Sequence, residues 1–458
     1  MTPTDYDRNR PMKKMRSRAS LLVALTLAAH GPVAGQDLAA LLSQADSANP
    51  EIMGARHLAE AAAARVPQAG ALPDPMLGVG VMNVPVARPG LGNDMMTMAQ
   101  VRLSAELPWP GKLGLREDVV RLQADADALE VERVRQRVRA DVRATYYRVY
   151  FLDRALDVTA RNELLLAALA SVTATRYGVG SAAQPDVLRA QVERSLLSDQ
   201  LVALREERLT AVARLNALAA RPVHAPVAST ELPASIRTAA LAGPAISRGA
   251  PTFASAALGD LTPSTALGGG LTSPEELRRL ALDHNPMLRA HARRVEAQEQ
   301  ALMLAQRATL PDLNVTAGYS RRAGFGDFFD LMISAPLPIF AGRKQSQGVI
   351  EQASTLGEHQ ARHDAMVNQL NAEIASLATQ LTRTRAQLLL LDDAILPQSR
   401  AGLESATASY RVGRVDFEAL LDAQVSVFRH ELDYYRLLAD FATALASLER
   451  AVGAEVLP

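Results

Sequence analysis

The chain has no cysteine among its 458 residues. This absence excludes disulfide bonds, thiolate metal sites, a cysteine nucleophile and a lipid anchor attached through an N-terminal cysteine. The sequence also lacks a phosphate-binding loop, a nucleophile elbow and an HExxH motif, so neither catalysis nor ATP hydrolysis has a candidate site. We therefore expect a protein that is not an enzyme and that has no cofactor.

An excess of charge of either sign is also missing, because 49 lysine and arginine residues balance 49 aspartate and glutamate residues. Six basic residues precede the apolar run LLVALTLAA at 21–29, and small residues follow it up to Gly35. This order is typical of a secretory signal peptide at 1–35, whose removal would leave a net charge of about −4. We expect an exported protein without a nucleic-acid partner.

Beyond this segment the sequence has no apolar run of the roughly 18 to 20 residues with which a helix spans a bilayer. If the protein crosses a membrane, we expect it to do so with strands.

The two halves of the chain match in one order at an offset of about 230 to 240 residues. The matched motifs are NPE at 49 and NPM at 285, LPDP at 72 and LPDL at 310, SAELPWPGK at 104 and SAPLPIFAGRK at 334, and AQV at 190 and 423. The sequence thus predicts a first repeat at 36–220, a linker at 221–272 and a second repeat at 273–458.

Each repeat has the order helix, two strands, very long helix, turn, helix. The predicted helices are 36–65, 113–176, 184–220, 273–307, 343–409 and 416–452. The two longest would measure about 95 and 100 Å, and the two shorter helices of each repeat could pair end to end along them. Val134, Val138 and Val142 belong to a three-and-four apolar spacing that predicts a coiled-coil-like seam. Pro397 should bend the helix at 343–409.

The predicted strands alternate apolar and polar residues. In QVRLSAEL at 100–107 one face carries Val101, Leu103, Ala105 and Leu107, and the other carries Gln100, Arg102, Ser104 and Glu106. Such runs suit tilted outer-membrane strands of about 9 to 11 residues, but a half-buried soluble sheet alternates identically. Four strands cannot close a barrel alone, so a barrel implies several protomers.

Two kinds of turn occur once in each repeat. The turns from strand to helix contain proline and glycine, which stop a strand and redirect the chain: Pro108, Trp109, Pro110, Gly111, Pro338 and Gly342. The turns between helices, or tips, are RYGVGSAAQPDVLRAQ at 176–191 and YRVGRVDFEALLDAQ at 410–424. Gly180 and Gly413 permit a sharp reversal, and an ordinary helical hairpin explains these glycines without explaining the shared Tyr, Val and Ala-Gln-Val.

Together these features resemble the TolC-like outer membrane efflux protein family, also called outer membrane factors, and PWPGK at 108–112 resembles its heavy-metal efflux branch of the CzcC and CusC type. The resemblance implies a mainly α fold with a small β part. Tandem-duplicated long α-helical hairpins would form a coiled-coil-like α-barrel, and four strands per protomer would contribute to a trimeric 12-stranded transmembrane β-barrel.

The resemblance also implies a function. The protein would be the outer-membrane channel of a tripartite efflux system in a Gram-negative bacterium, a passive trimeric duct for substrates such as heavy-metal cations, with a long periplasmic extension. Its partners would be two further copies, outer-membrane lipid, a periplasmic membrane-fusion adaptor and an inner-membrane pump of the RND type. The tunnel alone does not distinguish this duct from one that serves multidrug efflux or type I protein secretion, and a periplasmic coiled-coil scaffold or adaptor is an alternative of another class.

The resemblance assigns roles to residues of both tips. The adaptor-contact positions are Val179, Gly180, Ser181, Val412, Gly413 and Arg414, and the positions at or near the periplasmic gate are Asp186, Tyr410, Arg414 and Asp422. Ala419 departs from the family pattern, in which an acid is common, so a single acidic ring from Asp422, helped by Glu418, is expected.

Two further patterns suggest metal ligands. His359 and His363 have the spacing of a helical metal pair, yet their segment is highly polar and no ligand set completes it nearby, which favours a solvated face. Met95, Met96 and Met98 adjoin a predicted strand, and a loop or lipid-facing position is favoured over copper binding. We therefore expect no metal site.

Overall fold

The computed structural model describes residues 37–87, 89–90, 94–228, 230–242 and 273–457. These residues belong to one compact unit, which spans Gly35–Pro458. The predicted signal peptide at 1–35 lies outside the described residues, as does most of the predicted linker.

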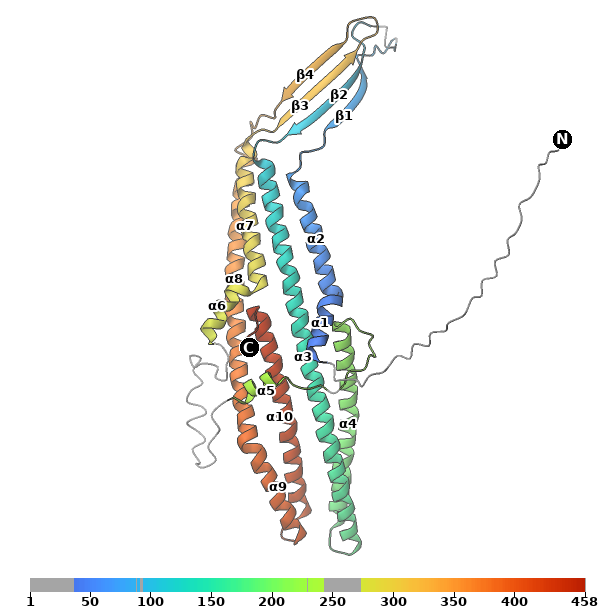
Figure 1. The fold of residues 1–458 in the computed structure, drawn as a ribbon, viewed down its shortest axis with the longest axis vertical. Coiled ribbons are helices and arrows are strands. Elements are labelled where there is room, and N and C mark those ends of the chain that lie inside the picture. Colours follow the sequence, from blue (N-terminus) through green and yellow to red (C-terminus); the bar gives the residue numbers. More distant parts are fainter. Residues whose placement is uncertain (1–36, 88, 91–93, 229, 243–272, 458) are drawn as a thin grey trace, which may run out of the picture. The chain divides into compact units, whose positions relative to one another are not determined.

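Long helices dominate this unit (Figure 1). The first repeat contains α1 (Leu38–Ala48), α2 (Pro50–Gly70), α3 (Lys112–Gly178) and α4 (Gln184–Leu218). The second contains α6 (Pro274–His284), α7 (Pro286–Gln306), α8 (Gln345–Leu390), α9 (Leu396–Arg411) and α10 (Phe417–Val452), with a short 3-10 helix at Arg307–Thr309. As predicted, α2 and α4 both pack along α3, and α7 and α10 both pack along α8.

The second long helix is interrupted where the sequence predicts a bend. Between α8 and α9 the chain forms a π-helical turn at Leu391–Ile395, directly before Pro397. Proline has no amide hydrogen, and its ring collides with the carbonyl four residues earlier, so a regular α-helix cannot continue through this position. The regular α-helix is thus interrupted close to the position where the sequence predicts a bend.

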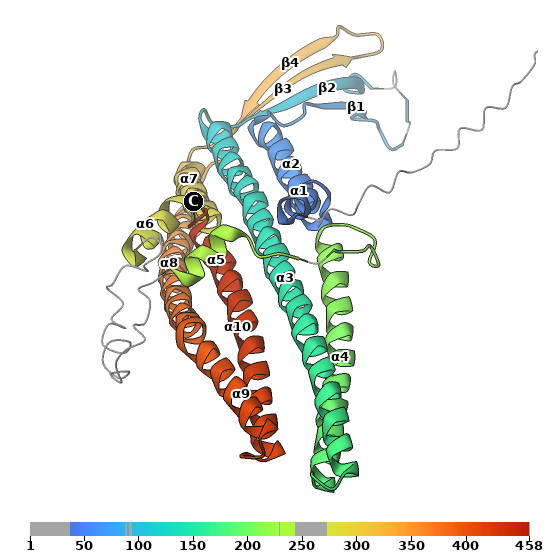
Figure 2. The ribbon, with the colours of Figure 1, turned by 60° about the horizontal axis from the view of Figure 1, so that its bottom comes forward.

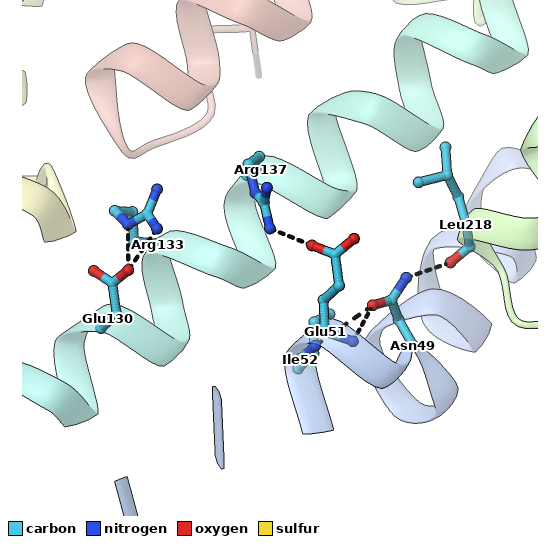
Figure 3. Close-up of polar contacts among 7 residues, drawn as sticks. All are labelled: Asn49, Glu51, Ile52, Glu130, Arg133, Arg137 and Leu218. Carbon is cyan, nitrogen blue, oxygen red and sulfur yellow. Dashed lines mark hydrogen bonds and ion pairs between the residues drawn. The ribbon is translucent and has the colours of Figure 1, made fainter. Parts of the chain in front are cut away.

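The first helix of each repeat differs from the prediction, because it consists of two helices separated at an Asn-Pro step. Asn49 caps α2 by accepting hydrogen bonds from the amides of Glu51 and Ile52, and its own amide donates to the Leu218 carbonyl at 2.8 Å (Figure 3). Asn285 caps α7 in the same way and donates to the Ala451 carbonyl at 2.7 Å. Each asparagine therefore ties the break to the end of the last helix in its own repeat.

The buried core runs along the long helices. Val134, Val138 and Val142 of the predicted seam are buried in a cluster to which α1, α3, α4, α8 and α10 contribute, and a second cluster of buried residues lies near the tips. An ion pair between Arg137 and Glu51 ties α3 to the start of α2 at the edge of this core (Figure 3). The coiled-coil-like pairing predicted from apolar spacing is thus confirmed for α3.

The described part of the predicted linker contains regular structure. It contains α5 (Ala234–Leu241), which packs against α8 and α10 of the second repeat (Figure 2). Just before α5, the amide and hydroxyl of Thr230 donate to buried Asp153 of α3, at 3.0 and 3.2 Å. This segment therefore joins the first repeat to the second.

Four antiparallel strands form one sheet in the order β1-β2-β3-β4, with β1 at Met76–Met82, β2 at Met98–Leu107, β3 at Leu313–Arg321 and β4 at Phe328–Ser334. The central pair, β2 with β3, joins the two repeats, with Ser104 opposite Thr316. One face is apolar and exposed, since Val79, Leu103, Leu331 and Ile333 retain 78, 49, 63 and 65% of their surface. β1 and β4 are the edge strands of this sheet within the described residues.

Among the described residues, no helix combines the length and apolar character that a membrane-spanning helix requires.

Candidate functional site

The two tips have the same backbone geometry. Gly180 and Gly413 have φ angles of +76° and +74°. The Gly180 amide donates to the Tyr177 carbonyl at 2.9 Å and the Ser181 amide to the Arg176 carbonyl at 2.8 Å. In the second tip the Gly413 amide donates to the Tyr410 carbonyl at 3.1 Å and the Arg414 amide to the Ser409 carbonyl at 2.9 Å. Both turns are Schellman motifs, which require a left-handed residue where glycine is favoured.

This geometry leaves the predicted adaptor-contact residues accessible. Val179 and Val412, which precede the two glycines, retain 76 and 68% of their surface, and Ser181 and Arg414 are exposed. An apolar side chain exposed at the same place in both turns is available to a partner.

Tyr410, predicted at the gate, lies in a contact between the two tips. Its side chain is 9% exposed and packs edge-on against Phe417, with ring centres 6.0 Å apart. The guanidinium of Arg176 lies 4.7 Å from the centre of the Tyr410 ring and donates to the Tyr410 carbonyl at 3.4 Å. This cation–π contact joins the end of α3 to the end of α9, and Tyr177, the matching residue of the first tip, is 48% exposed and does not share it.

The charged residues that follow the tips form a mixed group. Arg189 of α4 pairs with Glu418 of α10 at 2.7 Å. The hydrogen bond and charge of Glu418 raise the pKa of Arg189, and the charges of Asp186 and Asp422 add to this. Asp422 is exposed and Asp186 half-buried. Glu418, expected to help an acidic ring, is thus engaged by an arginine of the same chain.

The first strand-to-helix turn forms a connection between the repeats at the base of the sheet. Gly111 has a φ angle of +86° and precedes α3, whose first residue, Lys112, is buried. The Lys112 ammonium donates to the Leu310 carbonyl at 2.6 Å and to the Asp312 carboxylate at 2.8 Å, and the Trp109 amide donates to the same carboxylate at 2.8 Å. Asp312 stands directly before β3, so this contact fixes the β2 end against the β3 start.

The second strand-to-helix turn is built differently. A run of turns starts at Pro338, whose carbonyl accepts from the Ala341 amide at 3.0 Å, and α8 begins at Gln345. Gly342 lies in this run without a positive φ angle. Its role is therefore not the same as that of Gly111.

The histidines predicted on a solvated face are instead half-buried. The rings of His359 and His363 on α8 each lie with their centres 5.9 Å from the ring of His291, a buried residue of α7. The solvated-face prediction was wrong because α7 packs on this side of α8. In the described residues no three His, Cys, Asp or Glu side chains are placed to hold a metal ion as they stand. Met95 and Met96 are exposed, in line with a loop position.

Several residues that contact the predicted site residues could not be identified from the sequence. Arg176, Arg189, Asp312 and His291 acquire their contacts only when the second repeat folds against the first or α7 against α8. Lys112 and Asp312 lie in the motifs PWPGK and LPDL, but neither motif indicates that the two side chains form an ion pair.

A family model described as outer membrane efflux protein matches residues 41–221 and 277–454. The cobalt-zinc-cadmium resistance protein CzcC of Cupriavidus metallidurans is 23% identical over 181 residues, 39% of this chain and 42% of that protein. The outer membrane efflux protein BepC of Brucella suis is 25% identical over 322 residues, 68% of this chain and 62% of that protein. The chain thus spans 42 and 62% of these curated relatives.

The solved structure of the outer-membrane channel OprN superposes with a TM-score of 0.73 at 18% identity, and the match covers 92% of this chain and 91% of that one. At this identity the likeness shows a common fold.

Proposed function

This chain belongs to the outer membrane efflux protein family, and on this premise we propose that it is the outer-membrane channel subunit of a tripartite efflux system. Three copies form a passive duct that carries substrate from a periplasmic adaptor and an inner-membrane pump, of the RND type, to the outside. The observation that carries the proposal is the four-stranded sheet, which has an exposed apolar face and, among the described residues, no strand paired with the outer edge of β1 or of β4.

Assembly of three copies would pair the outer edges of the sheet and cover its apolar face with lipid. Backbone groups at the edges of β1 and β4 need hydrogen-bond partners in a membrane, where water does not supply them. If β4 of one copy pairs with β1 of the next, three copies close the sheet and twelve strands surround one opening. The apolar face then contacts lipid.

The duplication supplies the register of this pairing. Ser334 of β4 matches Ser104 of β2 in the two repeats, and Gly78 of β1 matches Thr316 of β3. Because Ser104 pairs with Thr316 within the chain, Ser334 is expected to pair with Gly78 of the next copy. The same register puts Ile333 opposite Val79 and Leu331 opposite Val81, so the apolar face continues without a break.

The tips recruit the adaptor and narrow the duct. Support comes from the exposed Val179 and Val412 beside identical turns, and from the contact of Arg176 with Tyr410 that holds one tip against the other. The strand-to-helix turn with Lys112 and Asp312 positions the sheet on the helices.

The proposed cargo is heavy-metal cations. CzcC, whose name states cobalt-zinc-cadmium resistance, supports this class. A strain that lacks this protein should become more sensitive to these cations than to drugs. A larger gain in sensitivity to drugs would assign the duct to multidrug efflux.

The duct itself is tested by planar-bilayer recordings of the purified protein. We expect discrete conductance steps from the trimer. A trimer that inserts into the bilayer without conducting would contradict the proposal.

Charge at the periplasmic end should set ion preference. Replacing Asp422 with Asn removes one exposed negative charge per copy and should lower the cation-to-anion permeability ratio about twofold or more, because charge rings attract counter-ions into narrow openings. Arg189→Gln is the matched control of opposite sign, since it removes a positive charge that interacts electrostatically with Asp422 and should raise the ratio. If neither variant alters the ratio measured in bilayers, these residues do not line the narrow end.

A further inference from the structure

Three histidines meet where α7 packs along α8. His291 of α7 is only 3% exposed, and its ring centre lies 5.9 Å from those of both His359 and His363. The two histidines of α8 are four residues apart, so they lie on one face of the helix. The group belongs to neither the tips nor the sheet, and none of the roles proposed above uses it.

Each of these rings has a buried nitrogen atom that lacks a hydrogen-bond partner in the described part of the chain, which is unusual. The Nδ1 atoms of His291, His359 and His363 are all shielded from solvent, and each has no hydrogen-bond partner among the described residues. Buried polar atoms without partners are rare in folded proteins, because they lose their contact with water without compensation. Three neighbouring rings that each carry such an atom are candidates for binding a ligand.

The surroundings of His291 disfavour the protonated imidazole. Burial lowers the pKa of His291, and the charges of His363, His359, Arg294 and Arg362 lower it further. A neutral imidazole offers a lone pair to a metal ion. The positive charge of each arginine is balanced by an acidic partner. Arg362 pairs with Glu358 at 2.7 Å, and Arg294 pairs with Asp127 of α3 at 3.8 Å.

We propose that His291, His359 and His363 form an inducible site for one divalent first-row transition-metal ion, such as Zn²⁺ or Co²⁺, that links α7 to α8. Imidazole nitrogens bind such ions at about 2.1 Å, which places the centres of three ligating rings about 5 to 6 Å apart. The distances from the ring centre of His291 to those of His359 and His363, both 5.9 Å, lie within this range.

Ring orientation is what must change on binding. As the rings stand, their donor atoms do not converge on one position. A half-turn about the Cβ–Cγ bond exchanges the nitrogen and carbon edges of an imidazole without moving its centre far. Three histidine ligands leave a fourth position open to water or to another ligand, as in zinc sites that are not structural.

The site is tested on the full mature protein, purified in detergent without a polyhistidine tag and stripped of metal. Titration calorimetry with Zn²⁺ alone, and the visible absorption of added Co²⁺, should show one tight site per chain at pH 7.5. The variants His291→Gln, His359→Gln and His363→Gln should each bind at least about tenfold more weakly. Affinity should also fall below about pH 6, where protons compete for imidazole.

The matched control is His57→Gln, which removes an exposed histidine of α2 that pairs with Glu60 at 3.0 Å. It should bind as the wild type does. Circular dichroism of each variant shows that loss of binding does not come from unfolding. Equal affinity and stoichiometry in the wild type and in folded His291→Gln protein would overturn the assignment, whatever the result for the duct.

Discussion

Replacing Leu331 with arginine is expected to reduce the amount of trimer in the outer membrane more than tenfold. Leu331 is the central residue of β4, it is 63% exposed, and it lies on the apolar face opposite Ala317. Arginine on the lipid-facing side of a membrane strand costs about 2–4 kcal/mol near the bilayer midplane. Three copies of the substitution enter each trimer, so the cost is repeated around the ring. Trimer in membrane fractions is measured by its resistance to heat in SDS.

Met332→Arg is the matched control. Met332 is the next residue of the same strand, is 51% exposed, and lies opposite Thr316 on the other face. In the closed ring this face surrounds water, which solvates arginine at little cost. Equal tolerance of Leu331→Arg and Met332→Arg would indicate a soluble sheet instead.

Replacing both Gly180 and Gly413 with valine is expected to reduce export and adaptor crosslinking more than tenfold while the trimer persists. A branched side chain at a positive φ angle costs about 1–3 kcal/mol at each position, so the chain relieves the strain by altering the turns. Both turns lie at the far end of helices from the sheet, about 100 Å away along the 67 residues of α3. The sheet should therefore assemble normally.

Gly402→Val provides the comparison for this double variant. A Cβ atom added at Gly402, Gly180 or Gly413 meets nothing within 4 Å, so the three sites offer similar space. Gly402 lies inside α9 and has no positive φ angle, so this variant should export normally. Normal export by the double variant would show that the tips do not recruit the adaptor.

The parts of the fold that could be predicted from the sequence are those set by local pattern and by the duplication. Regular apolar spacing marks α3, and strict alternation marks β2, because each pattern repeats with the period of its own structure. Gly180 and Gly413 could be placed in sharp turns because few other residues adopt the left-handed conformation. The Asn-Pro breaks before α2 and α7 were not predicted, since the sequence has helical character on both sides of each step.

Contacts that depend on how helices pack could not be predicted. Nothing near Tyr410 in the sequence indicates Arg176, and nothing near Lys112 indicates Asp312, because about 200 residues or more separate each pair along the chain. His291 likewise stands far from His359 in sequence, and its burial follows from the packing of α7 on α8. The duplication predicts equivalent positions, but Lys112 and Arg176 have their partners in the other repeat, which a comparison of repeats does not reveal.

The closing of the sheet by three copies is tested most directly by disulfide crosslinking, because the chain has no cysteine of its own. The variant with Gly78→Cys and Ser334→Cys should, on oxidation in membranes, give covalent trimers that reductant converts to monomers. The variant with Ser104→Cys and Thr316→Cys carries the equivalent pair of the central strands and should form a disulfide within each chain. If this control oxidises and the Gly78 and Ser334 pair leaves only monomers, β4 does not pair with β1 of a neighbouring copy and the proposed duct is contradicted.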